Sequence, residues 1–177
     1  MKSVLFIFKK VPFTAFIFYK GLLPIWNYIV SGIEYLYYVI TDKETVKASN
    51  LIINDLKTQV NKGLSIHELL SFFGDFEWKS DPLHGFLDYK TKAKITLIKK
   101  TGDCDDFMGL FYTLLKNKYD VKQCYVYSEK DGHAMLIAKI NDKYDIISNL
   151  NYVTGFDTIE EASKFFYGQQ TYFHYKV

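Results

Sequence analysis

The chain has 177 residues and a formal net charge of +2, and 49% of its residues are hydrophobic. This length allows one compact domain with an added element and leaves too little room for two full domains. The nearly balanced charge argues against a nucleic-acid partner, and two cysteines are too few for a disulfide framework, so a reducing compartment is expected.

The first 44 residues are rich in aromatic and aliphatic side chains, and lysines and two prolines interrupt their apolar runs. No uncharged stretch is long enough to cross a membrane, and no signal-peptide cleavage pattern follows the first apolar run. We predict a helix over residues 22–40, with Pro24 in its first turn. Three interpretations of residues 1–44 stay open: an arm docked on the rest of the chain, an interfacial membrane helix, or a surface for a homo-oligomer or larger assembly.

Residues 45–177 are expected to form the main domain, which begins with two helices. An amphipathic pattern predicts the first over residues 45–62. The second is predicted over residues 65–73, where Ser65 and Glu68 have the spacing of a capping box.

The most informative segment is the run Gly-Asp-Cys-Asp-Asp at residues 102–106. Asp103 is a good N-cap, and Asp106 stands where a capping-box acid would. The apolar residues that follow recur at helical spacing, which predicts a helix over residues 103–117. Cys104 would then lie at a helix N-terminus, where the partial positive charge favours the thiolate that a nucleophile requires.

Three short strands joined by tight turns are predicted after this helix: residues 123–128, 133–140 and 144–150. The second strand begins at His133, a candidate general base. Because the last two strands form a hairpin, Ser148 and Asn149 return beside His133, and one of them can orient its ring. Alternation puts the two side chains on opposite faces, and Asn149 is the preferred choice.

A short helix over residues 158–166 and a final strand over residues 172–177 complete the prediction. The expected fold class is α+β: a helical N-terminal half packed beside a small antiparallel sheet, with the nucleophile at the N-terminus of a central helix. Cys104 and His133 are distant in sequence, but a helix packed on the sheet with its first turn near the histidine strand brings them together.

The segment from Trp78 to Tyr89, the run at residues 102–106 and Gly-His-Ala at residues 132–134 resemble the bacterial transglutaminase-like cysteine proteases, within the transglutaminase-like, papain-related superfamily. The resemblance implies a cysteine that begins a helix packed on an antiparallel sheet and a histidine on the next sheet element. In that family the third catalytic residue is an acid, commonly in an Asp-Asn pair. This sequence has serine and asparagine at residues 148–149 instead.

The acids beside Cys104 need a counter-charge, because carboxylates next to a thiol raise its pKa. Either they point away, or a hard cation such as calcium neutralises them. The resemblance implies calcium bound through the two acids that flank the cysteine, which are Asp103 and Asp105 here. The cysteine chemistry itself requires no cofactor.

We therefore expect cysteine-dependent acyl transfer from a peptide or side-chain amide of a protein substrate. Cys104 attacks the carbonyl, His133 carries the proton, and Asn149 or Ser148 holds the imidazole. Hydrolysis by a protease or amidase is favoured over crosslinking because the resemblance is to proteases. The alternative is a catalytically degenerate transglutaminase-like module that serves in binding or assembly, for example in a phage particle. The expected location is cytoplasmic or virion-associated.

Overall fold

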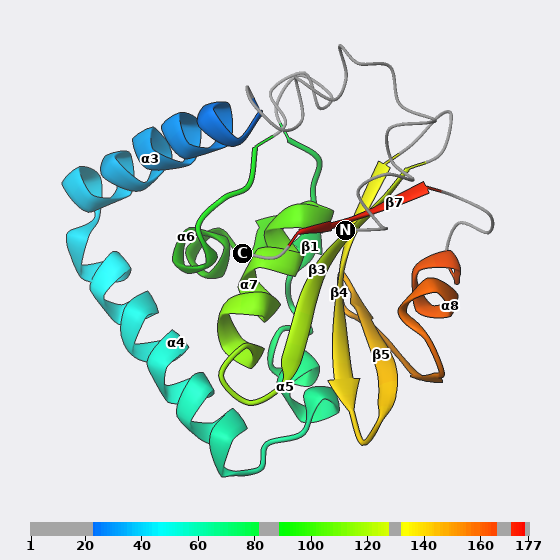
Figure 1. The fold of residues 1–177 in the computed structure, drawn as a ribbon. Coiled ribbons are helices and arrows are strands. Elements are labelled where there is room, and N and C mark those ends of the chain that lie inside the picture. Colours follow the sequence, from blue (N-terminus) through cyan, green and yellow to red (C-terminus); the bar gives the residue numbers. More distant parts are fainter. Residues whose placement is uncertain (1–22, 82–88, 128–131, 166–170, 176–177) are drawn as a thin grey trace.

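The computed structural model describes four stretches of the chain: residues 23–81, 89–127, 132–165 and 171–175. The fold class is α+β, as predicted, with most helices on one side of an antiparallel sheet (Figure 1). The helices are α3 (Leu23–Thr41), α4 (Lys43–Lys62), α5 (Ile66–Phe72), α6 (Ala93–Lys99), α7 (Cys104–Leu115) and α8 (Ile159–Lys164).

Five of these helices lie where the sequence predicts them, and side-chain caps explain several of their first residues. Asp42 accepts the Thr45 N–H at the start of α4, and Ser65 and Glu68 form the predicted capping box of α5. Helix α6 was not predicted. It is only seven residues long and has no side-chain cap, and three of its residues are β-branched, so its sequence carries little helical signal.

The main sheet has the strand order β6-β5-β4-β3-β7, and every neighbouring pair in it is antiparallel. Its strands are β3 (Asp120–Tyr127), β4 (Gly132–Ile140), β5 (Lys143–Ser148), β6 (Asn151–Phe156) and β7 (Thr171–Tyr175). The predicted hairpin between β4 and β5 is present. Its two turn residues, Asn141 and Asp142, both have positive φ, as the tightest hairpin turns require. Strand β6 was not predicted.

Helix α7 is the centre of the molecule. It packs on β3, β4 and β5 with one side and on α4 and α6 with the other, so nearly all of its side chains are buried. Alternation along β4 divides the core in two: Ala134 and Leu136 join the α7 side, whereas Met135 and Ile137 join the side covered by α8. This burial fixes the position of the first turn of α7 relative to the sheet.

The predicted N-terminal arm is seen in part. Its first 22 residues lie outside the described part of the chain, and α3 follows them and runs to Thr41, next to α4. Among the described helices, none is both long and apolar enough to cross a membrane.

Candidate active site

The first turn of α7 carries the candidate nucleophile. Cys104 is its first residue, and Asp103 is its N-cap, with Oδ1 accepting the N–H groups of Asp105 at 3.2 Å and Asp106 at 3.4 Å. Strand β2 (Thr101–Gly102) pairs in parallel with β1 (Glu77–Trp78) just before the helix. A Cβ on Gly102 would lie 2.7 Å from the Asp106 Cβ, so the chain needs glycine at this close approach.

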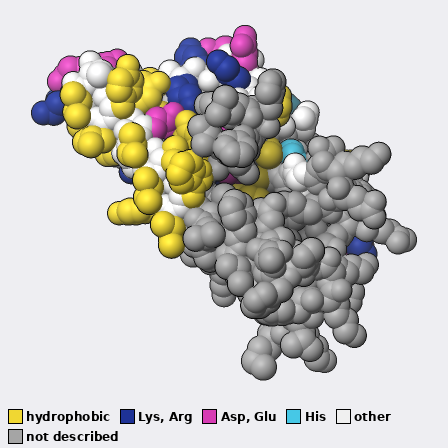
Figure 2. All heavy atoms as spheres, turned by 90° about the horizontal axis from the view of Figure 1, so that it is seen from above, with side chains coloured by type: hydrophobic (Ala, Val, Ile, Leu, Met, Phe, Trp, Pro, Cys, Tyr) yellow, Lys and Arg dark blue, Asp and Glu magenta, His cyan; other side chains and the backbone are white. Residues whose placement is uncertain are grey.

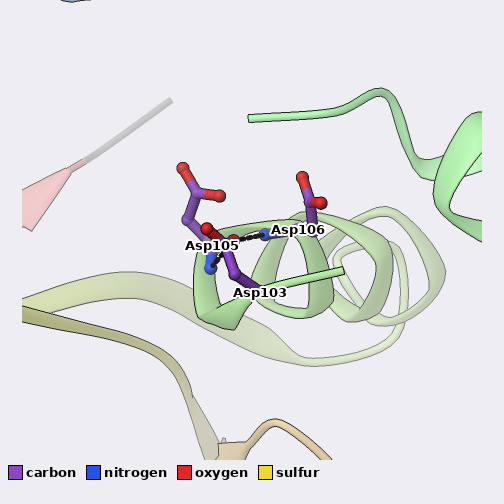
Figure 3. A group of neighbouring side chains, drawn as sticks. All are labelled: Asp103, Asp105 and Asp106. Carbon is purple, nitrogen blue, oxygen red and sulfur yellow. Dashed lines mark hydrogen bonds between the residues drawn. The ribbon is translucent and has the colours of Figure 1, made fainter. Parts of the chain in front are cut away.

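Three carboxylates gather in this turn. Oxygen atoms of Asp103, Asp105 and Asp106 lie within 4.8 Å of one another, and Figure 3 shows Asp105 and Asp106 pointing to the same side of the helix. Asp106 does not complete a capping box; its Oδ1 accepts the Thr91 N–H at 2.6 Å instead. Burial, followed by the charge of Asp103, raises the pKa of Asp106 to about 7.

Lys90 places a positive charge beside these acids. Its side chain crosses α7 at Gly109, where an added Cβ would lie 2.4 Å from the Lys90 Cε. Burial lowers the pKa of Lys90, and the charges of Asp105 and Asp106 oppose that shift. Lys90 was not predicted as a site residue from the sequence. Gly109 was the available signal, because a glycine inside a helix often marks a close approach by another group.

The candidate base lies on the sheet. His133 is the second residue of β4, and a hydrogen bond of 2.7 Å joins its Nε2 to the Oγ of Ser148, the last residue of β5. Burial lowers the pKa of His133, and the charge of Asp103 opposes the shift. Asp103 therefore lies within electrostatic range of His133, which connects the first turn of α7 to the start of β4.

Asn149 does not take the position expected from the sequence. Strand β5 ends at Ser148, and Asn149 lies in the turn to β6 with a φ of 50°. Its Oδ1 is buried and has no hydrogen-bond partner among the described residues. The hydrogen bond to His133 therefore comes from Ser148 and not from Asn149, the residue preferred from the sequence. The turn at position 149 needs a left-handed residue, which asparagine tolerates.

Two further residues bear on the site. Trp78 pairs with Gly102 across the β1–β2 ladder, and Gly102 lies two residues before Cys104. The Trp78 side chain is exposed. Cys124 is fully buried in β3, and this burial raises the pKa of its thiol to about 12. The two cysteines form no disulfide, and Cys104 is partly exposed whereas Cys124 is buried.

No protein-family model matches this sequence, and no curated protein does. Among solved structures, the fold is distantly similar to Legionella pneumophila LapG. The calcium-bound form is 20% identical with a TM-score of 0.45, and the match covers 61% of this chain and 65% of that one. The EGTA-treated form is 20% identical with a TM-score of 0.44 over 61% and 63% of the two chains. This chain thus spans less than two thirds of the LapG chains that it matches.

Proposed function

We propose that the protein is a transglutaminase-like cysteine hydrolase that cleaves peptide or side-chain amide bonds in a protein substrate. The observation that carries this proposal is the hydrogen-bonded pair of His133 and Ser148, within electrostatic range of the residue that precedes Cys104. A thiol at a helix start, an imidazole and a group that orients the imidazole are the elements of nucleophilic acyl transfer.

In the proposed mechanism, His133 takes the proton from the Cys104 thiol. Because the pKa of His133 is lowered, its ring is neutral at neutral pH and can accept that proton. The thiolate attacks the carbonyl carbon, and the backbone N–H of Cys104 contributes to stabilising the oxyanion. His133 then protonates the leaving amine, and water releases the acyl group from the sulfur.

Ser148 gives this mechanism an unusual third member. A hydroxyl can hold the imidazole in one orientation, but it carries no charge to stabilise the imidazolium that forms. Asp103 supplies the negative charge that favours the protonated ring. We therefore assign orientation to Ser148 and electrostatic support to Asp103.

Alkylation of Cys104 by iodoacetamide tests the proposal. We expect rapid labelling below pH 8 and slow labelling in His133→Ala. Because the pKa of His133 is lowered, the rate in the wild type should fall only once the pH drops below the ordinary pKa of histidine, about 6.5. Cys124 is an internal control, because its burial and raised pKa keep it unreactive. Equal rates in the wild type and His133→Ala would instead support the second candidate, a non-catalytic module, which the serine at position 148 favours.

We also propose that the acids of the first turn bind calcium. Asp103, Asp105 and Asp106 offer carboxylate oxygens close together, and these are ligands that calcium prefers. The ion would neutralise charge next to the nucleophile. Calcium should raise the melting temperature of the wild type and have no effect on Asp105→Asn, with magnesium as the control for ionic strength. Equal effects of calcium and magnesium on both proteins would contradict this proposal.

A further inference from the structure

Helix α3 is amphipathic in the reverse of the usual sense, because its polar side faces the rest of the protein. Asn27 Oδ1 accepts the Lys90 N–H at 3.0 Å. Glu34 Oε1 accepts hydrogen bonds from Lys99 Nζ at 3.1 Å and from the Tyr89 hydroxyl at 3.3 Å. These contacts attach α3 to the segment that leads into α6, and they orient the helix about its axis.

The opposite side of α3 is apolar and exposed. Five aliphatic side chains at helical spacing form it, and we call them the α3 stripe: Ile25, Ile29, Ile33, Leu36 and Ile40. Their exposure is high, reaching 64% at Ile33 and 74% at Ile40. Figure 2 shows hydrophobic side chains gathered along this helix. Trp26 and Tyr37, also exposed, widen the stripe.

Positive charge borders the stripe. The ammonium groups of Lys92 and Lys94 lie 4.3 Å and 4.1 Å from the ring centroid of Tyr35, a residue of α3 itself. Glu34 is paired with Lys99 on the inner side of the helix. The next acids, Asp42 and Glu44, follow the C-terminal end of α3, so the positive charge of Lys92 and Lys94 lies beside the middle of the helix.

We propose that the α3 stripe docks on an anionic membrane surface, with the helix lying along the interface. An apolar helical face with tryptophan and tyrosine beside it and lysines at its border is the pattern of interfacial helices. The lysines complement the negative charge of lipid headgroups. A second copy of the chain fits less well, because a twofold contact through the stripe would bring the lysines of the two copies together.

Co-sedimentation with lipid vesicles tests this proposal on the full chain. We expect binding to vesicles of phosphatidylcholine with phosphatidylserine and little binding to phosphatidylcholine alone. The double variant Ile29→Ser/Ile33→Ser should weaken binding by about tenfold or more. Lys92→Gln/Lys94→Gln should weaken it severalfold, and high salt should remove that difference. Leu51→Ser is the matched control, because Leu51 on α4 is 64% exposed, like Ile33, but lies outside the stripe.

Three results would overturn the proposal. One is the absence of binding to either vesicle. Another is equal binding to neutral and anionic vesicles. The third is a dimer in light scattering that the isoleucine variant converts to monomer, which would assign the stripe to a second copy. Labelling of Cys104 in the same variants should be unchanged, so a failure here is separate from a failure of the proposed hydrolase.

Discussion

The two halves of the candidate site balance their charges in different ways. The helix half has three carboxylates in one turn. One of its nearby cations is Lys90, whose side chain lies against α7 at Gly109, and Lys99 also acts on Asp106. The sheet half is a neutral pair, His133 and Ser148, joined by one hydrogen bond. Loss of a charge in the helix half is thus expected to lower stability. Loss of the His133 orientation in the sheet half is expected to lower the reactivity of Cys104.

The largest effect is expected from Lys90→Met, which keeps the aliphatic stem and removes the charge. Asp105 and Asp106 would then lose a nearby cation in a partly buried environment, and Lys99 would still act on Asp106. The free energy of unfolding should fall by about 3 kcal/mol. Urea denaturation at pH 8, where Asp106 is ionised, measures this change.

Lys143→Met is the control for Lys90→Met. Lys143 pairs with Asp157 on the surface, and both side chains are exposed. Its loss should leave the free energy of unfolding nearly unchanged, because solvent screens an exposed ion pair. If both variants lost equally little free energy of unfolding, the charge of Lys90 would not be needed to stabilise the acids of the first turn. If calcium restored the stability of Lys90→Met, the ion and the lysine would serve the same acids.

Gly109→Ala tests the helix half through the close approach of the Lys90 side chain to α7. Alanine in a helix interior is normally favoured over glycine by about 1 kcal/mol. At position 109, however, the new Cβ would meet Lys90 and displace its side chain from the acids. We expect a net loss of about 1 kcal/mol in thermal or urea denaturation. Gly32→Ala in α3 is the matched control: no atom lies within 4 Å of its Cβ position, so it should be stabilising. A gain in stability in both variants would show that the Lys90 side chain can move away from Gly109 without lowering the stability.

Ser148→Ala tests the sheet half. It removes the hydrogen bond to His133 Nε2, so the stability should fall by about 1 kcal/mol and alkylation of Cys104 should slow by about tenfold or more. Ser163→Ala is the control, since this buried hydroxyl donates to the Glu160 carbonyl at 2.9 Å in α8, away from the site. It should lose similar stability without any change in labelling. Equal labelling in the two variants would remove Ser148 from the proposed mechanism.

The parts of the fold that the sequence predicted are those with local signals. The N-cap at Asp103, the capping box at Ser65 and the hairpin turn at Asn141 each depend on residues a few positions apart. The contact of Lys90 with the first turn of α7 has no such signal, because it depends on the path of a loop. The sequence therefore indicated the acids near Cys104, but it gave no sign that Lys90 lies beside them.

Helices α3 and α4 show a second limit of sequence reasoning. Both are amphipathic, and α4 buries its apolar side, with Val46, Leu56 and Val60 in the core. In α3 the apolar side is exposed, and partly buried polar contacts at Asn27 and Glu34 set its orientation. Periodicity reveals that a helix has an apolar face, but which face meets the protein depends on partners that are distant in sequence.

The smallest effect is expected from Asn149→Gly, which distinguishes the two candidates for the group that orients His133. Glycine adopts the positive φ of this turn without strain, and the change removes a buried Oδ1 that has no partner among the described residues. Stability should therefore change by less than about 1 kcal/mol, and alkylation of Cys104 should be unchanged. Asn149→Ala should be less stable than Asn149→Gly, because its Cβ is strained at this φ. If labelling slowed in both variants as in Ser148→Ala, Asn149 would act on the imidazole after all, and the sheet half would depend on both residues of the Ser-Asn pair rather than on the serine alone.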